Sequence, residues 1–84
     1  MNSTRALPIN IDLDDCHILH VEHRRSEYHF AEIVTVVVQT PKGKVYYAAL
    51  VDDLELLKKP GEAQDRFING CTDKVRRHMG IVDG

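Results

Sequence analysis

The sequence predicts an α+β fold: a three- to four-stranded antiparallel β-meander with a C-terminal helix packed on one face. Three observations support this fold class. Runs of β-branched and aromatic residues flank the turn sequence TPKG at residues 40–43. Apolar residues recur at helical spacing between Glu62 and Met79. The chain has 84 residues, which is enough for one domain with a small core.

We expect a single domain over residues 9–80, with flexible ends at 1–8 and 81–84. After Pro8, the sequence INIDLDD alternates apolar and polar residues, which predicts a short edge strand. A further strand is expected over residues 16–23, and the polar sequence HRRS at its end is expected to form a loop.

The strongest strand candidate covers residues 28–40, and residues 44–51 form its return strand. Pro41 suits the first corner of the connecting turn, and Gly43 suits a position with positive φ. Both runs are rich in β-branched and aromatic side chains, so an antiparallel hairpin is expected here.

The register of this hairpin decides which side chains share a face. If Thr40 pairs with Lys44, Val38 lies opposite Tyr46, and Tyr46 and Tyr47 point to opposite faces. Both faces are then apolar, whereas a half-solvated sheet should alternate. We therefore expect both faces to be covered, with a homodimer as one way to cover the second.

The C-terminal third predicts a short helical turn and then one helix. Asp52 or Asp53 caps a turn over residues 54–57, which Pro60 and Gly61 end. Glu62 to Met79 then forms the helix, which Gly80 terminates. Its expected apolar stripe consists of Phe67, Ile68, Cys71, Val75 and Met79. A break at Asn69-Gly70 is the alternative, since glycine inside a helix costs about 1 kcal/mol relative to alanine.

The sequence CHILHVEHRRSEYHF at residues 16–30 holds four of the five histidines. On a strand, His17 and His23 point one way and His20 the other, so they do not form one ligand set. If HRRS is the loop, His20 lies opposite His29, roughly 5 Å apart at Cβ. These two are the candidates for a weak metal or pH-sensing pair, and a one-residue slip of register removes the pair. No cofactor is expected.

Neither cysteine predicts catalysis. Cys71 falls in the apolar stripe of the helix, where a buried thiol is inert. Cys16 follows Asp14 and Asp15, whose charges would raise the pKa of its thiol. Because no general base and orienting group accompany either thiol, we expect a protein that is not an enzyme.

The charge balance bears on the partner. Eleven Lys and Arg residues stand against thirteen Asp and Glu, which argues against a protein that wraps duplex nucleic acid. We expect a small non-catalytic protein-binding or regulatory module, with an inhibitor among the options, that self-associates. The candidate partner-binding residues are the basic ones expected at loops and the helix end: Arg24, Arg25, Lys42, Lys44, Arg76 and Arg77.

Two alternatives stay open: a single-stranded nucleic-acid binder that uses these basic residues with sheet aromatics, and a metal or pH-sensing protein that uses the histidine pair. The first residues contain no apolar leader, and no apolar run is long enough to span a bilayer. With two widely separated cysteines, these features predict a reduced, cytoplasmic protein.

Overall fold

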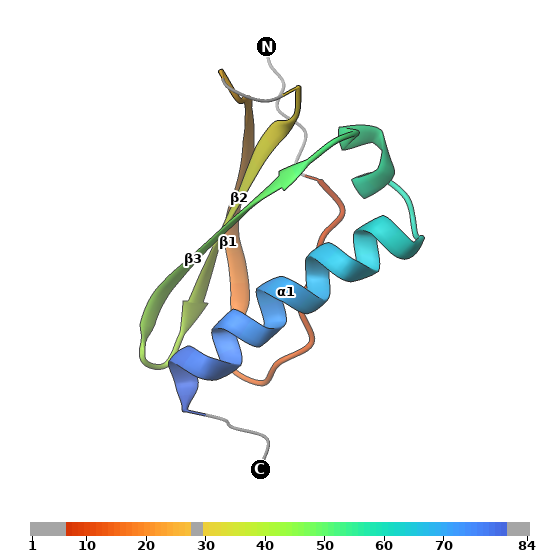
Figure 1. Ribbon diagram of the computed structural model, residues 1–84. Helices are drawn as coiled ribbons and strands as arrows, with labels where there is room; N and C mark the ends of the chain where they lie inside the picture. Colours follow the sequence, from red (N-terminus) through yellow and green to blue (C-terminus); the bar gives the residue numbers. More distant parts are fainter. Residues whose placement is uncertain (1–6, 28–29, 81–84) are drawn as a thin grey trace.

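The computed structural model describes residues 7–27 and 30–80. It contains one antiparallel sheet of three strands in the order β1-β2-β3: β1 (His17–Arg25), β2 (Glu32–Thr40) and β3 (Gly43–Val51). A 3₁₀ turn, η1 (Leu54–Leu57), leads into the helix α1 (Glu62–Met79). Figure 1 shows α1 lying across one face of the sheet, which confirms the predicted α+β meander.

The β2–β3 register differs from the predicted one by one residue. Thr40 pairs with Gly43 rather than with Lys44, so Val36 lies opposite Tyr47. The Thr40 side chain fixes this turn, because its hydroxyl donates to the Gly43 carbonyl at 2.8 Å and accepts from the Lys42 amide at 3.0 Å. Gly43 has a φ of 113°, which favours glycine. The slip turns every β3 side chain to the face opposite the predicted one.

The first hairpin also differs from its prediction. β1 continues through Arg25, which pairs with Glu32, so HRRS is not a loop. The connection instead spans residues 26–31, and the Ser26 amide donates to the Ala31 carbonyl at 3.0 Å. A bulge between Ile18 and His20 shifts the alternation. The bulge keeps apolar side chains on the helix side of β1 on both sides of it.

The segment before β1 packs as an irregular strap and not as the expected edge strand. Leu7 and Ile9 are buried, and Ile11 and Leu13 pack against the same core. The Gln64 side chain anchors the strap to α1, because its amide donates to the carbonyls of Pro8 and, at 3.0 Å, of Leu57. The strap therefore contributes side chains to the core without adding a hydrogen-bonded strand.

The helix α1 runs unbroken from Glu62 to Met79, which confirms the continuous helix. Its end is also as predicted, since Gly80 is left-handed with a φ of 81° and its amide donates to the carbonyls of Arg76 and Arg77. Gly70 does not interrupt the helix because the Tyr47 ring packs against it: a Cβ there would overlap the Tyr47 hydroxyl and lie 3.0 Å from Cζ.

The core lies between the sheet and α1. Three β2 valines have no exposed surface, and they belong to the same core cluster as the apolar residues of α1 and Leu57 of η1. The fully buried side chains are Val34, Val36, Val38, Leu57, Cys71 and Val75. Asp53 caps η1 as predicted, since its side chain accepts from the Glu55 amide at 3.1 Å. This cap fixes the path from the end of β3 into α1.

Candidate interaction surface

β3 is an outer strand of the sheet, so half of its backbone groups point away from β2 and have no neighbouring strand among the described residues. In an antiparallel ladder, successive residues direct their backbone groups alternately to one neighbour and to the other. The Tyr46 carbonyl accepts from the Lys74 ammonium and therefore points away from β2. Lys44, Ala48 and Leu50 share this direction with Tyr46. We call the outward backbone groups of these four residues the β3 edge.

The opposite edge of the sheet, β1, is protected in three ways. The bulge near His20 distorts its ladder. Its side chains are mostly polar and exposed. Side-chain contacts also anchor it to β2, because the Glu32 carboxylate lies 3.2 Å from His23 Nδ1 and 3.6 Å from Arg25 Nε. Strand addition at β1 is therefore disfavoured, whereas residues 45–51 of β3 carry no charge at all.

The sheet face that α1 does not cover is apolar beside β3 and polar beside β1. On this face, Ile33 of β2 lies between Leu50 of β3 and Arg24 of β1. Val37 of β2 likewise lies between Tyr46 of β3 and His20 of β1. Tyr46 and Leu50 keep 58% and 54% of their surface exposed. Apolar surface therefore continues from this open face to the β3 edge.

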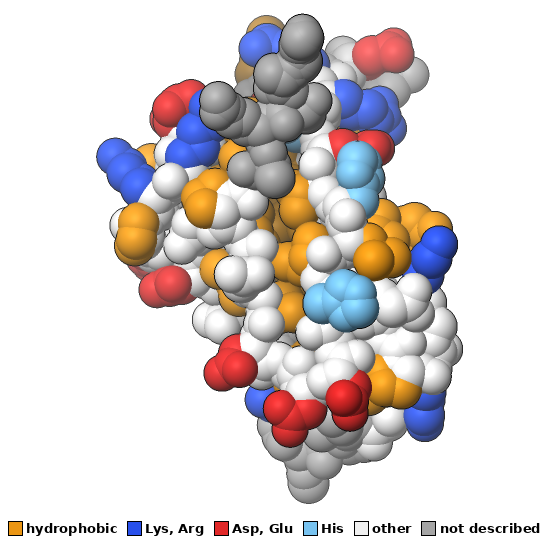
Figure 2. Space-filling view, turned by 180° about the vertical axis from the view of Figure 1, so that it is seen from behind, with side chains coloured by type: hydrophobic (Ala, Val, Ile, Leu, Met, Phe, Trp, Pro, Cys, Tyr) orange, Lys and Arg blue, Asp and Glu red, His pale blue; other side chains and the backbone are white. Residues whose placement is uncertain are grey.

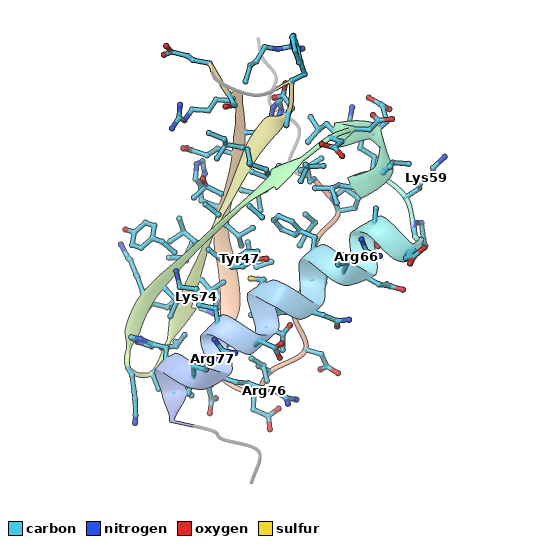
Figure 3. All side chains as sticks on the ribbon, viewed as in Figure 1. Tyr47, Lys59, Arg66, Lys74, Arg76 and Arg77 are labelled. Carbon is cyan, nitrogen blue, oxygen red and sulfur yellow. The ribbon has the colours of Figure 1, made fainter. Side chains whose placement is uncertain are left out.

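On its helix side, the β3 edge borders two clefts that Tyr47 separates. The cleft near η1 has a volume of ≈ 380 Å³ and lies beside Asp52, Asp53 and Arg66. The cleft near the β2–β3 turn has a volume of ≈ 690 Å³ and lies beside Lys74 and Arg77. Figure 3 shows Tyr47 pointing from β3 towards α1, with Arg66 to one side of it and Lys74 and Arg77 to the other.

Tyr47 divides the clefts because neighbouring groups hold its ring. The ring meets Phe67 edge-on, with centroids 5.3 Å apart and planes at 73°. Burial raises the pKa of the Tyr47 hydroxyl, and the nearby Cys71 and Asp73 raise it further. Tyr46 and Tyr47 do point to opposite faces, as predicted, so they form no common stacking platform.

The six predicted partner-binding residues fall into two groups at opposite ends of the sheet. Lys42 and Lys44 lie at the β2–β3 turn, where α1 also ends, since His78 Nε2 contacts the Lys42 carbonyl at 3.1 Å. Arg77 lines the cleft there, and Arg76 on the same helical turn is half-buried. Arg24 and Arg25 lie in β1 at the far end of the sheet, not in a loop tip.

The histidine pair proposed from the sequence is not supported by the register. His20 lies opposite Val37, and its Nε2 contacts Glu22 Oε1 at 2.8 Å, while His29 lies outside the described residues. Figure 2, a view from behind, shows histidine side chains spaced along one side of a band of hydrophobic side chains. Over residues 7–27 and 30–80, no three His, Cys, Asp or Glu side chains are grouped to hold a metal ion.

Both cysteines are poor nucleophiles. Burial raises the pKa of the Cys71 thiol to about 11, although Lys74 lowers it somewhat. Burial also raises the pKa of the Cys16 thiol, and the charges of Asp15 and Asp14 add to the rise as expected. Both side chains are therefore thiols, not thiolates, at neutral pH.

No family model, curated protein or solved structure matches the chain. Among the helices in the described part of the chain, none has the length and apolar character to cross a membrane. Sequence reasoning missed Tyr46, Ala48, Leu50 and Lys74 as site residues. The signal was the uncharged run VYYAALV, which marks β3 as unprotected once its place at the edge of the sheet is known.

Proposed function

We propose that this chain is a small non-catalytic protein-binding module that recognises an extended strand along the β3 edge. The observation that carries the proposal is the contrast between the two edges of the sheet. The β1 edge is bulged and lined by polar and charged side chains, whereas the β3 sequence is uncharged between Val45 and Val51. Such an edge supplies backbone hydrogen bonds to an added strand.

The surroundings of the β3 edge suit strand addition. Backbone pairing alone confers little specificity, and the side chains of an added strand alternate between the two faces of the sheet. On one face they would meet Tyr46 and Leu50, and on the other they would enter the clefts beside Tyr47. A partner strand with apolar side chains on both faces would fit this surface.

The nucleic-acid alternative has weaker support. Tyr46 is the aromatic side chain of β3 that is open for stacking, and Tyr47 is engaged with Phe67. Single-strand binders use successive aromatic platforms beside a basic groove. Within the described residues, the open face of the sheet carries no second aromatic beside Tyr46.

A matched pair of proline variants tests the proposal. Ala48→Pro removes an amide that points outwards from β3, so the β2–β3 ladder keeps its bonds. By the same alternation, the His23 amide points outwards from β1, and His23→Pro is the control. Each variant is immobilised beside the wild type and exposed to a lysate of the organism that encodes the chain, after melting curves confirm folding.

Proteins retained by the wild type and by His23→Pro, but lost with Ala48→Pro, would support the β3 edge as the binding surface. Equal retention by all three proteins would contradict the proposal. Hydrogen exchange gives a second readout, because partner binding should protect the amides of Tyr46, Ala48 and Leu50. The amides of β3 that already pair with β2 should change little.

A further inference from the structure

We infer that the strand that occupies the β3 edge is β3 of a second copy, antiparallel to the first and centred on Ala48. This inference rests on the proposed function and names the partner. β3 has opposite charges at its two ends, with Lys42 just before it and Lys44 at its start, and Asp52 and Asp53 just after it. Antiparallel pairing places the basic end of one strand beside the acidic end of the other, whereas parallel pairing would bring like charges together.

The outward-pointing residues fix the possible registers, because each must pair with another outward-pointing residue. With the two-fold axis at Ala48, Tyr46 lies opposite Leu50 of the second copy, and Lys44 lies opposite its Asp52. These pairs join an aromatic with an aliphatic side chain and a cation with an anion on the open face. Moving the axis to Tyr47 places Lys44 opposite Leu50 and loses both matches.

The clefts on the helix side show the same complementarity. The cleft near η1 is lined by Asp52, Asp53 and Arg66, two anions against one cation, so it is acidic on balance. The cleft near the turn is lined by Asp73, Lys74 and Arg77, one anion against two cations, so it is basic on balance. The two-fold axis of an antiparallel strand pair is perpendicular to the sheet, so both helices lie on one face. The acidic cleft of each copy then faces the basic cleft of the other. The result is a continuous sheet of six strands, formed by three strands from each copy.

Lys74 opposes this pairing in the single chain. Its ammonium binds the Tyr46 carbonyl, which the amide of Leu50 from the second copy must reach in the Ala48-centred register. Lys74 is exposed and can move into solvent when the strands pair.

Sedimentation equilibrium over a wide range of protein concentration tests the inference, with three kinds of variant. Ala48→Lys keeps the backbone but brings two like charges together at the axis, so dimerisation should be lost. Lys44→Glu should weaken the dimer by about tenfold, as should Asp52→Lys, and the double variant should restore it. Thr35→Lys is the control for face-to-face stacking, because it adds charge to the open face beside Ala48 but on the central strand, one strand away from the β3 edge.

Cross-linking tests the register in a Cys16→Ser background. Opposed residues in a hydrogen-bonded antiparallel pair have Cα atoms about 5.5 Å apart, which is within disulfide range. Ala48→Cys should form a disulfide-linked dimer under mild oxidation. Tyr46→Cys alone should not, since it meets Leu50, whereas Tyr46→Cys combined with Leu50→Cys should.

A wild-type chain that stays monomeric at all concentrations would overturn the inference. So would a dimer that persists in Ala48→Lys or is lost in Thr35→Lys. The proposed function is tested separately. If the chain stays monomeric but Ala48→Pro still abolishes retention of a host protein, strand addition at the β3 edge is supported and only the second copy is excluded as the partner. If dimerisation follows the predictions while retention of host proteins ignores the edge, the second copy is the strand partner and no heterologous one uses this edge.

Discussion

Replacing Gly70 with alanine should destabilise the protein, against the usual preference of helices. In an open helix, alanine is more stable than glycine by about 1 kcal/mol. Here the new Cβ would overlap the Tyr47 hydroxyl and approach Cζ to 3.0 Å. Forcing extra volume into a packed site costs roughly 1–3 kcal/mol. Part of that cost comes from a weaker edge-on contact with Phe67, because the new Cβ would displace the Tyr47 ring.

The difference between these terms is a net loss of about 1 kcal/mol, equivalent to a fall in melting temperature of about 4–8 °C. Urea denaturation of the wild type, Gly70→Ala, Tyr47→Phe and the double variant measures it. Tyr47→Phe removes the overlapping oxygen, so Gly70→Ala should cost less in that background. Asn69→Ala is the control, because it raises helix propensity at an exposed neighbouring position. Stabilisation by Gly70→Ala in the wild-type background would refute the reasoning.

Three further predictions concern the core and the titratable groups. Val36→Asp should leave the chain unfolded by circular dichroism, because it buries an unpaired charge at a site with no exposed surface; a melt at the wild-type temperature would contradict this. Cys71 has a pKa raised from 9.0 to about 11, so its stabilising effect is present below pH 9 and is lost as pH rises towards 11. The free energy of unfolding from urea denaturation should therefore fall across that window by about 1.4 kcal/mol per pH unit from this group, and the fall should be smaller in Cys71→Ala. His23→Ala should change the free energy of unfolding by less than about 1 kcal/mol, since its pair with Glu32 is partly exposed; a larger loss by urea denaturation would show that the pair anchors β1.

The elements that the sequence predicted well are those set by local signals. The helix from Glu62 to Met79 has a periodic apolar stripe and a terminal glycine, and both act within a few residues of the backbone that they organise. The capping of η1 by Asp53 is equally local. The tolerance of Gly70 inside the helix was not predictable, because its cause is Tyr47, a residue that is distant in sequence.

The predicted strand registers were wrong because the pattern of apolar and polar residues did not determine them. Residues 36–38 are three consecutive valines, so either register of β2 with β3 gives two apolar faces. The observed register is fixed by the Thr40 hydroxyl, which forms the hydrogen bonds that close the turn. In β1 the predicted pairing of His20 with His29 depended on HRRS being the loop, whereas the strand continues through Arg25, which pairs with Glu32. Side-chain direction therefore followed from turn hydrogen bonds and from the position of the β1–β2 connection, which periodicity does not encode.

The candidate site was predicted only in part. Lys42, Lys44 and Arg77 do gather at one end of the molecule, but the β3 edge depends on which strand lies outermost in the sheet. That position follows from the order β1-β2-β3 and from the absence of a fourth strand among the described residues. A fourth strand from INIDLDD would have altered the edges, and the sequence alone allowed it.

The bulge in β1 has a consequence for the size of any assembly. A sheet with two adhesive edges adds subunits without limit and grows into a filament. In the proposed assembly the β3 edge pairs with another strand, whereas in the described part of the chain the β1 edge carries the bulge and the contacts of His23 and Arg25 with Glu32. When two copies pair through β3, both β3 edges are buried, and only the two β1 edges remain at the outside of the sheet. The bulge in β1 would thus prevent the addition of further strands and limit the assembly to a closed dimer.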